Sequence, residues 1–175
     1  MNSGSHKIRV GVSSCLLGYD VRYDGKNKKN DNVIKLSDTF DLMAICPEYG
    51  IGMGVPRAPI NIINVDGKFH ARGVANPGYD VTESLQELAE AIIKSHKDLC
   101  GYVFKARSPS CGLDSTPWFD TDGNEKGLTS GIFSQQVQMR LPDLPMIEET
   151  QLTCGIEIEQ FIERVNNYAN VNRSP

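Results

Sequence analysis

Three cysteines in this chain of 175 residues each follow a short apolar run that predicts a β-strand. Cys15, Cys46 and Cys111 come after the runs at residues 8–12, 42–45 and 102–104. In an open α/β sheet, the loops after the carboxyl ends of the strands share one edge, where ligands bind. Glycine, proline or serine stands beside each thiol and lets the backbone come close to a bound group. We therefore expect the three thiols to face one crevice.

The rest of the chain predicts an α/β fold. We expect helices at about 31–37, 81–93, 129–140 and 157–170, a further strand at 145–147, and hairpins around Asp66-Gly67 and Asp122-Gly123. Strands that alternate with helices indicate a mostly parallel, open sheet with helices on both faces, to which the hairpins are small insertions. The length fits one domain, so we expect a single domain at residues 7–175 after an N-terminal extension at residues 1–6.

The composition excludes two classes of partner. A net charge of −4 and a pI near 5.4 argue against nucleic-acid binding, because phosphate contacts need clustered Lys and Arg. The basic cluster Lys26, Lys28 and Lys29 lies among Asn and Asp and is typical of a solvated loop. No apolar run approaches the roughly 20 residues of a membrane span, and the first six residues lack the apolar core of a signal peptide. We expect a cytoplasmic protein.

Five cysteines without an export signal are expected to be reduced thiols, which favours metal binding or catalysis. No Cys-x-x-Cys pair occurs, so the fold itself must assemble any metal site. Three thiolates could hold zinc and a water, or a [4Fe–4S] cluster with one open iron, and both choices stay open at this point. Cys100 and Cys154 are expected to be small buried hydrophobes, although Cys154 could be a fourth ligand. We expect ordinary polar roles for the histidines His6, His70 and His96.

Other polar residues close to these cysteines are candidates for the same site. Glu48, two residues after Cys46, could be a general base, a ligand or a surface charge. Ser108 could donate a hydrogen bond to a substrate or stabilise a proline turn. Further candidates for contact with the substrate are Arg22, Asp24, Arg57 and Ser110. For the charged members of this group, a surface ion pair is the alternative role.

Several motifs occur in order along the chain and together resemble one family. They are Ser14 to Gly18 with Val21 to Gly25, Cys46 to Glu48 with Val55 to Arg57, and Lys105 to Gly112. This arrangement resembles the bacterial family that was long catalogued as a domain of unknown function and that includes the 2-thiouracil desulfurases. The resemblance runs from about Lys7 to the helix expected at 129–140.

The resemblance implies that Cys15, Cys46 and Cys111 hold a [4Fe–4S] cluster with one iron that no residue ligates. Such a cluster is sensitive to oxygen and can be lost from protein prepared in air. The implied activity is the non-redox desulfuration of a small thiolated pyrimidine or a related thiocarbonyl compound, in which 2-thiouracil and water give uracil and hydrogen sulfide. Glu48 would deprotonate the attacking water, and Ser108 would orient the heterocycle or relay a proton.

Two alternatives remain at this stage. A zinc-dependent hydrolase or deaminase would use the same three cysteines with Glu48, but the chain lacks the His-x-Glu and Pro-Cys-x-x-Cys signature of the known zinc deaminases. A non-catalytic module would hold an iron–sulfur cluster without turnover. The identity of the bound metal distinguishes the first alternative from a desulfurase. Turnover of a thiolated base distinguishes the second alternative from a desulfurase.

Overall fold

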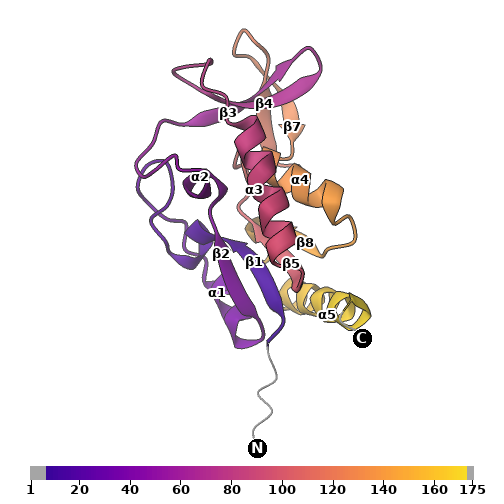
Figure 1. The fold of residues 1–175 in the computed structure, drawn as a ribbon. Coiled ribbons are helices and arrows are strands. Elements are labelled where there is room, and N and C mark those ends of the chain that lie inside the picture. Colours follow the sequence, from indigo (N-terminus) through magenta and orange to yellow (C-terminus); the bar gives the residue numbers. More distant parts are fainter. Residues whose placement is uncertain (1–6, 173–175) are drawn as a thin grey trace, which may run out of the picture.

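The computed structural model describes residues 7–172, so the expected N-terminal extension and His6 lie outside the described residues. A four-stranded parallel sheet, sheet A, carries the order β2-β1-β5-β8 (Figure 1). Its strands are β1 (Arg9–Ser13), β2 (Asp41–Ile45), β5 (Leu99–Phe104) and β8 (Met146–Glu148). All six residues of β5 are buried, as expected of a central strand with both faces covered. The predicted parallel sheet is thus confirmed.

The two predicted hairpins form and join into a second sheet, sheet B, of order β4-β3-β6-β7. Its strands are β3 (Ile60–Val65), β4 (Lys68–Gly73), β6 (Thr116–Phe119) and β7 (Glu125–Thr129). Each hairpin is antiparallel, whereas β3 and β6 pair in parallel, with Ile62 opposite Trp118. In Figure 1 sheet B lies above sheet A, and α3 runs from one towards the other. The hairpins are therefore not separate insertions but the two halves of one sheet.

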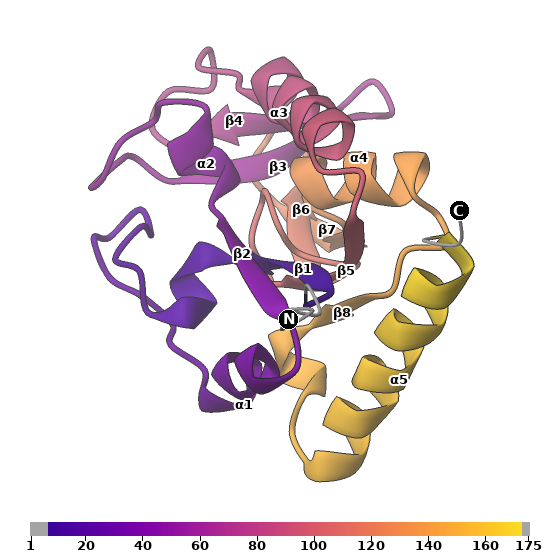
Figure 2. The same ribbon diagram turned by 60° about the horizontal axis from the view of Figure 1, so that its bottom comes forward.

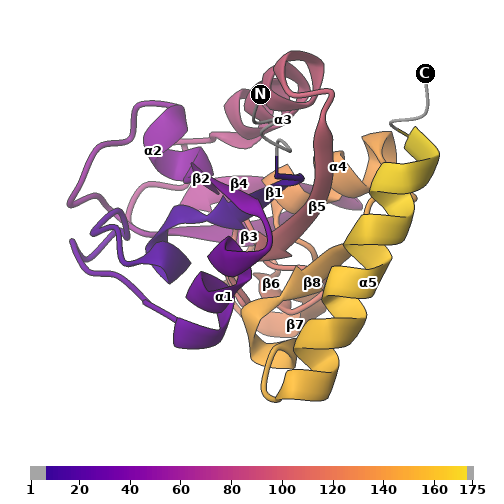
Figure 3. The same ribbon diagram turned by 90° about the horizontal axis from the view of Figure 1, so that it is seen from below.

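Helices cover both faces of sheet A, as predicted. The longer helices are α3 (Thr82–Ser95), α4 (Ile132–Arg140) and α5 (Gly155–Asn172), and the shorter ones are α1 (Asp31–Lys35) and α2 (Pro47–Gly50). One core packs α1 and α5 against β1 and β5, and a second packs α3 and α4 against the opposite face. Figures 2 and 3 show α5 along β8, on the side away from α3. Leu85 of α3 and Ile132 of α4 reach further, into a third core beneath sheet B.

Several element boundaries differ by a few residues from the sequence-based expectation. The helix expected from residue 129 begins at Ile132, because Thr129 is still paired with Thr116 in sheet B. The closing helix is longer than expected, since it spans Gly155–Asn172. The described residues also contain the 3₁₀ helices η1 (Ser14–Leu17), η2 (Leu36–Asp38) and η3 (Glu149–Gln151). Within residues 7–172, no helix has both the length and the apolar character needed to cross a bilayer.

Candidate active site

A pocket of about 400 Å³ lies at the carboxyl edge of sheet A. Cys15 in η1, Cys46 directly after β2 and Cys111 in the loop after β5 all line it. The three strands are adjacent and parallel, so their carboxyl ends bring these thiols to one place. None of the three thiols is part of a disulfide. The convergence expected from the sequence is therefore present in the fold.

The three thiols act on one another electrostatically. Burial raises the pKa of Cys15 to about 11, and the nearby Cys46 adds to this shift. Burial also raises the pKa of Cys46, and it raises that of Cys111 well above the ordinary value despite an opposing hydrogen bond with Ser13. Burial therefore favours the neutral thiol form of each cysteine. A bound metal centre would have to displace their protons, as metal binding to cysteine generally does.

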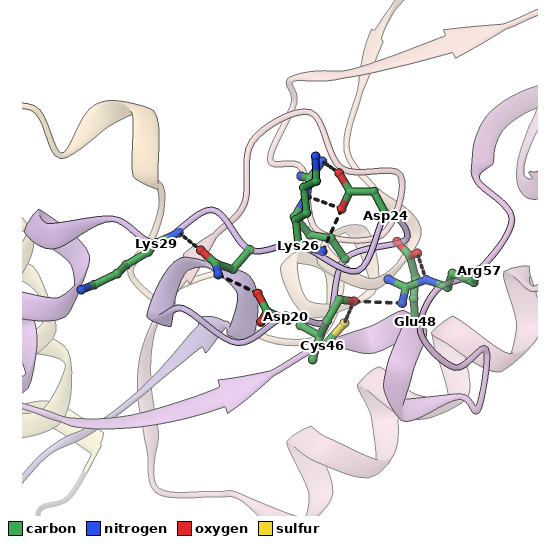
Figure 4. A network of polar contacts seen from close by, with 10 residues as sticks. Asp20, Asp24, Lys26, Lys29, Cys46, Glu48 and Arg57 are labelled. Atoms are coloured by element: carbon green, nitrogen blue, oxygen red, sulfur yellow. Dashed lines mark hydrogen bonds and ion pairs between the residues drawn. The ribbon is translucent and has the colours of Figure 1, made fainter.

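Glu48 is held in place by contacts on both of its carboxylate oxygens. Arg57 Nε donates to Oε2 at 2.7 Å, and Ser110 Oγ donates to Oε1 at 2.8 Å. The side chains of Glu48 and Arg57 are only 12% and 5% exposed, so neither is a surface charge. Arg57 Nη1 also donates to the carbonyl oxygens of Val21 and Gly54, both at 2.9 Å. Figure 4 shows the guanidinium group between Glu48 and the backbone beside Cys46.

The two serines next to Cys111 have different surroundings. Ser108 lines the pocket, and its Oγ accepts the N–H groups of Ser110 at 3.3 Å and Cys111 at 3.1 Å. These bonds form the turn that the sequence offered as one alternative, and they leave the Ser108 hydrogen available to a substrate. Ser110 is fully buried, does not line the pocket and contacts Glu48 instead. Of the two, only Ser108 is placed to touch a ligand.

Arg22 and Asp24 form an ion pair with each other, with Arg22 Nε 3.2 Å from Asp24 Oδ1. The hydrogen bond from Arg22 holds the pKa of Asp24 below its ordinary value, and Asp24 also accepts the N–H of Lys26. Arg22 lines the pocket and Asp24 does not. The structure therefore brings Arg22, Arg57, Glu48 and Ser108 together with the three thiols, and it leaves Asp24 and Ser110 behind them.

Comparison with known proteins identifies a family and individual proteins to which this chain is similar. A family model described as 2-thiouracil desulfurase matches residues 10–149, which include every lining residue of the pocket. The chain belongs to the 2-thiouracil desulfurase family. An uncharacterized protein of Bacillus subtilis (strain 168), YbbK, is 36% identical over 107 residues, which cover 58% of this chain and 71% of YbbK.

A solved structure shares the fold of this family member. It is the [4Fe–4S]-dependent thiouracil desulfidase TudS, with a TM-score of 0.69 and 24% identity. The similarity covers 90% of this chain and 99% of TudS. The α/β architecture predicted from the sequence is therefore also that of a solved relative.

Several pocket residues of this desulfurase-family chain escaped sequence reasoning. Lys105 lines the pocket and pairs with Glu149, whose Oε2 also accepts the Ala106 N–H at 2.7 Å. Glu148, the adjacent residue, accepts the Leu113 N–H at 2.7 Å and the Ser115 hydroxyl. The two carboxylates thus hold both ends of residues 105–115, the Cys111 loop. The only sequence signal was two acidic residues after an expected strand, and it could not show their burial.

The pocket carries an excess of positive charge. Its lining contains the carboxylate of Glu48 and the cationic side chains of Arg22, Lys28, Arg57, Lys105 and Arg107. Glu48, Glu149 and Asp24 compensate Arg57, Lys105 and Arg22, whereas Arg107 is exposed, with its backbone at φ 61°. A pocket with this balance favours a ligand or product that carries negative charge.

The remaining candidates lie away from the pocket lining. Cys100 is buried in the core, as predicted, and its Sγ donates to the carbonyl oxygen of Asp98 at 3.3 Å. The prediction that Cys154 is buried is wrong. Cys154 is exposed just before α5, where Glu157 accepts its backbone N–H and fixes the start of the helix at the surface. His70 contacts Asp80 at 2.9 Å, an ordinary polar role.

The donor set suits an iron–sulfur cluster better than one metal ion. Among residues 7–172, no three His, Cys, Asp or Glu side chains stand close enough to hold a single ion. A cluster is wider than an ion and binds thiolates that are further apart, and soft sulfur ligands favour iron–sulfur centres. Three free thiols around one pocket are therefore ligands of the kind that an iron–sulfur cluster takes.

Proposed function

We propose that this protein is an enzyme that removes sulfur from a small thiolated pyrimidine or a related thiocarbonyl compound, with 2-thiouracil as the reference substrate. The observation that carries the proposal is the meeting of three free thiols and the fixed Glu48 carboxylate in one pocket. Family membership and the fold shared with a [4Fe–4S]-dependent desulfidase support it.

Cys15, Cys46 and Cys111 would hold a [4Fe–4S] cluster. When bound, such a cluster with one iron free of protein ligands supplies a Lewis acid for the sulfur of a thiocarbonyl group. The overall change needs no oxidant or reductant, because water replaces sulfur at one carbon. The products are the carbonyl compound and hydrogen sulfide.

Glu48 acts as the general base in this proposal. Each of its carboxylate oxygens accepts one hydrogen bond from the protein and keeps a further lone pair for a water. The carboxylate takes a proton from that water as the water oxygen attacks the thiocarbonyl carbon, and the proton then passes to the departing sulfur. Arg57 and Ser110 contribute by position, since they fix the direction in which the carboxylate faces.

Ser108 and the cationic side chains would orient the substrate and stabilise the product. The Ser108 oxygen already accepts two backbone N–H groups, so its own hydrogen is free to be donated to a ring nitrogen or carbonyl oxygen. Arg22, Lys28 and Arg107 add positive charge around the pocket. That charge favours the anionic hydrosulfide over a neutral leaving group.

The test is anaerobic purification and reconstitution with iron and sulfide, followed by incubation with 2-thiouracil without added reductant. We expect about four iron atoms and four sulfides per chain, as the cluster type requires, and equal amounts of uracil and hydrogen sulfide. Zinc bound in place of iron would overturn the cluster assignment. A stable cluster that releases no sulfide from any thiolated pyrimidine would leave a binding module and refute the enzyme.

A further inference from the structure

Tyr102 on β5 has a hydroxyl group that the fold leaves without a partner. Tyr102 is fully buried. Within residues 7–172, its Oη is the one buried side-chain nitrogen or oxygen atom that makes no hydrogen bond. A buried hydroxyl without a hydrogen bond is costly, and phenylalanine would fill the same space without this cost. The hydroxyl therefore needs an explanation beyond packing.

The Tyr102 ring cannot turn to find another partner. It stacks on Phe104, with ring centroids 4.0 Å apart and planes 13° from parallel. On the neighbouring strand, Gly11 makes room for it, since a Cβ atom there would lie 2.6 Å from the ring atoms Cδ2 and Cε2. Phe133 of α4 packs 6.0 Å away. Side chains and backbone on several sides thus fix the direction of the hydroxyl.

Tyr102 does not itself line the cysteine pocket, but it lies in the buried layer directly behind Cys111. Tyr102 and Cys111 belong to the same buried cluster of side chains, which also contains Ile45, the neighbour of Cys46. Burial raises the pKa of Tyr102 well above its ordinary value, and Cys111, Cys46 and Cys15 raise it further, in that order. All three thiols therefore act on this one group, with Cys111 the strongest.

We propose that Tyr102 Oη is a hydrogen-bond donor for the iron–sulfur cluster: it donates to a sulfur atom of the group that Cys15, Cys46 and Cys111 hold. This inference rests on the proposed function only for the identity of the cofactor. Hydrogen bonds to cluster sulfurs stabilise the more electron-rich state and raise the reduction potential. A cluster with a raised potential gives up an electron less readily, so Tyr102 would slow its oxidative loss in a reaction that needs no electron transfer.

The test compares Tyr102→Phe with the parent and with Tyr168→Phe. Tyr168 is a half-buried tyrosine on α5 near Cys100 and serves as the matched control. Each protein is reconstituted anaerobically, and iron content, reduction potential and decay of the visible absorbance in air are measured. Resonance Raman spectra in H₂O and D₂O report an exchangeable hydrogen bonded to the cluster.

We expect Tyr102→Phe to hold as much iron as the parent, to have a more negative potential and to decay faster in air. It should also lose an isotope shift of the Fe–S stretching bands that the parent and Tyr168→Phe retain. An equal potential and an equal isotope shift in all three proteins would overturn the role of Tyr102 and leave the desulfurase proposal standing. A parent that holds no cluster would overturn both. The isotope shift is measured on the parent itself, so the proposal can fail even if Tyr102→Phe folds poorly.

Discussion

The pocket has two walls that are built in different ways. The Cys111 loop is tied to the protein interior: its Pro109 and Ser110 carbonyl oxygens accept N–H groups from the first residues of α4, and Glu148 and Glu149 hold its ends. The loop at residues 19–30 is mostly exposed, and its ion pair joins Arg22 to Asp24 two residues away. Arg57 fastens it through the carbonyl oxygens of Val21 and Tyr23.

This difference suggests that the two walls have different functions. Atoms that must hold a cluster or contact a reacting group need fixed positions, and Cys111 and Ser108 lie on the wall with buried partners. Charges that only attract or orient a ligand tolerate movement, and Arg22 and Lys28 lie on the exposed wall. Changes to the buried wall should therefore affect the cofactor and turnover, and changes to the exposed wall should affect the apparent affinity for substrate.

The largest effect is expected at a ligand in the buried wall. Cys111→Ser should abolish the brown colour and visible absorbance of the reconstituted protein, because a serine hydroxyl replaces a thiolate ligand. Cys100→Ser and Cys154→Ser are matched controls that should keep both, since neither thiol lines the pocket. Iron and sulfide analysis gives the measurement. Full cluster content in Cys111→Ser would contradict the role of Cys111 as a cluster ligand, and with it the proposed difference between the two walls.

The second-largest effect is expected at Glu48, the proposed general base. Glu48→Gln keeps the shape and one acceptor oxygen but removes the basic carboxylate, so turnover should fall roughly 10²- to 10⁴-fold. Cluster content and 2-thiouracil binding should stay near the parent values. Glu157→Gln, which removes a carboxylate at the start of α5, should leave turnover unchanged. If Glu48→Gln kept the turnover of the parent, Glu48 would not be the general base. If the variant lost the cluster, the role of Glu48 would be structural.

A smaller effect should come from the support of the Cys111 loop. Glu148→Gln turns charge-assisted hydrogen bonds to Leu113 and Ser115 into neutral ones, at a cost of about 1 kcal/mol in the free energy of unfolding. For a chain of this size, the Tm should drop by roughly 2 to 4 °C. Cluster release to a chelator should also become faster than in Glu90→Gln, a control in which the carboxylate binds Arg140 and Gln136 elsewhere. Equal release from both variants would show that the hydrogen bonds of Glu148 do not help the protein to retain its cluster.

The smallest effect is expected on the exposed wall. Arg22→Ala should raise KM by roughly 2- to 5-fold, the range expected for one charge that is partly open to solvent, and leave kcat and iron content unchanged. Lys26→Ala is the matched control, because it removes a positive charge from the same loop at a residue that does not line the pocket. Steady-state kinetics at two ionic strengths measure both variants. A loss of kcat or of iron in Arg22→Ala would show that the exposed wall shares in catalysis, and the comparison would fail.

The sequence could predict features that depend on local signals. Apolar runs placed the three cysteines at strand ends, and the Asp-Gly pairs placed both hairpins, where Gly67 and Gly123 adopt φ 82° and 85°. The pairing of β3 with β6 joins Ile62 to Trp118, and no local pattern encodes a contact across that separation. The same limit hid the partners of Glu48 and the burial of Glu148 and Glu149. Cys154 was misjudged because cysteine as a residue type is usually buried, whereas the helix start here holds it at the surface.

The hydrogen bonds by which Glu148 and Glu149 hold the Cys111 loop have a consequence for the order of events during synthesis of the chain. A ribosome releases all three cysteines before it releases Glu148, the last residue of β8, and Glu149, which follows it. Until β8 pairs with β5, the nascent chain carries all three thiols, but Glu148 and Glu149 do not yet hold the ends of the Cys111 loop. The wall of the pocket that carries Cys111 is therefore completed last, when the two glutamates fix both ends of the loop.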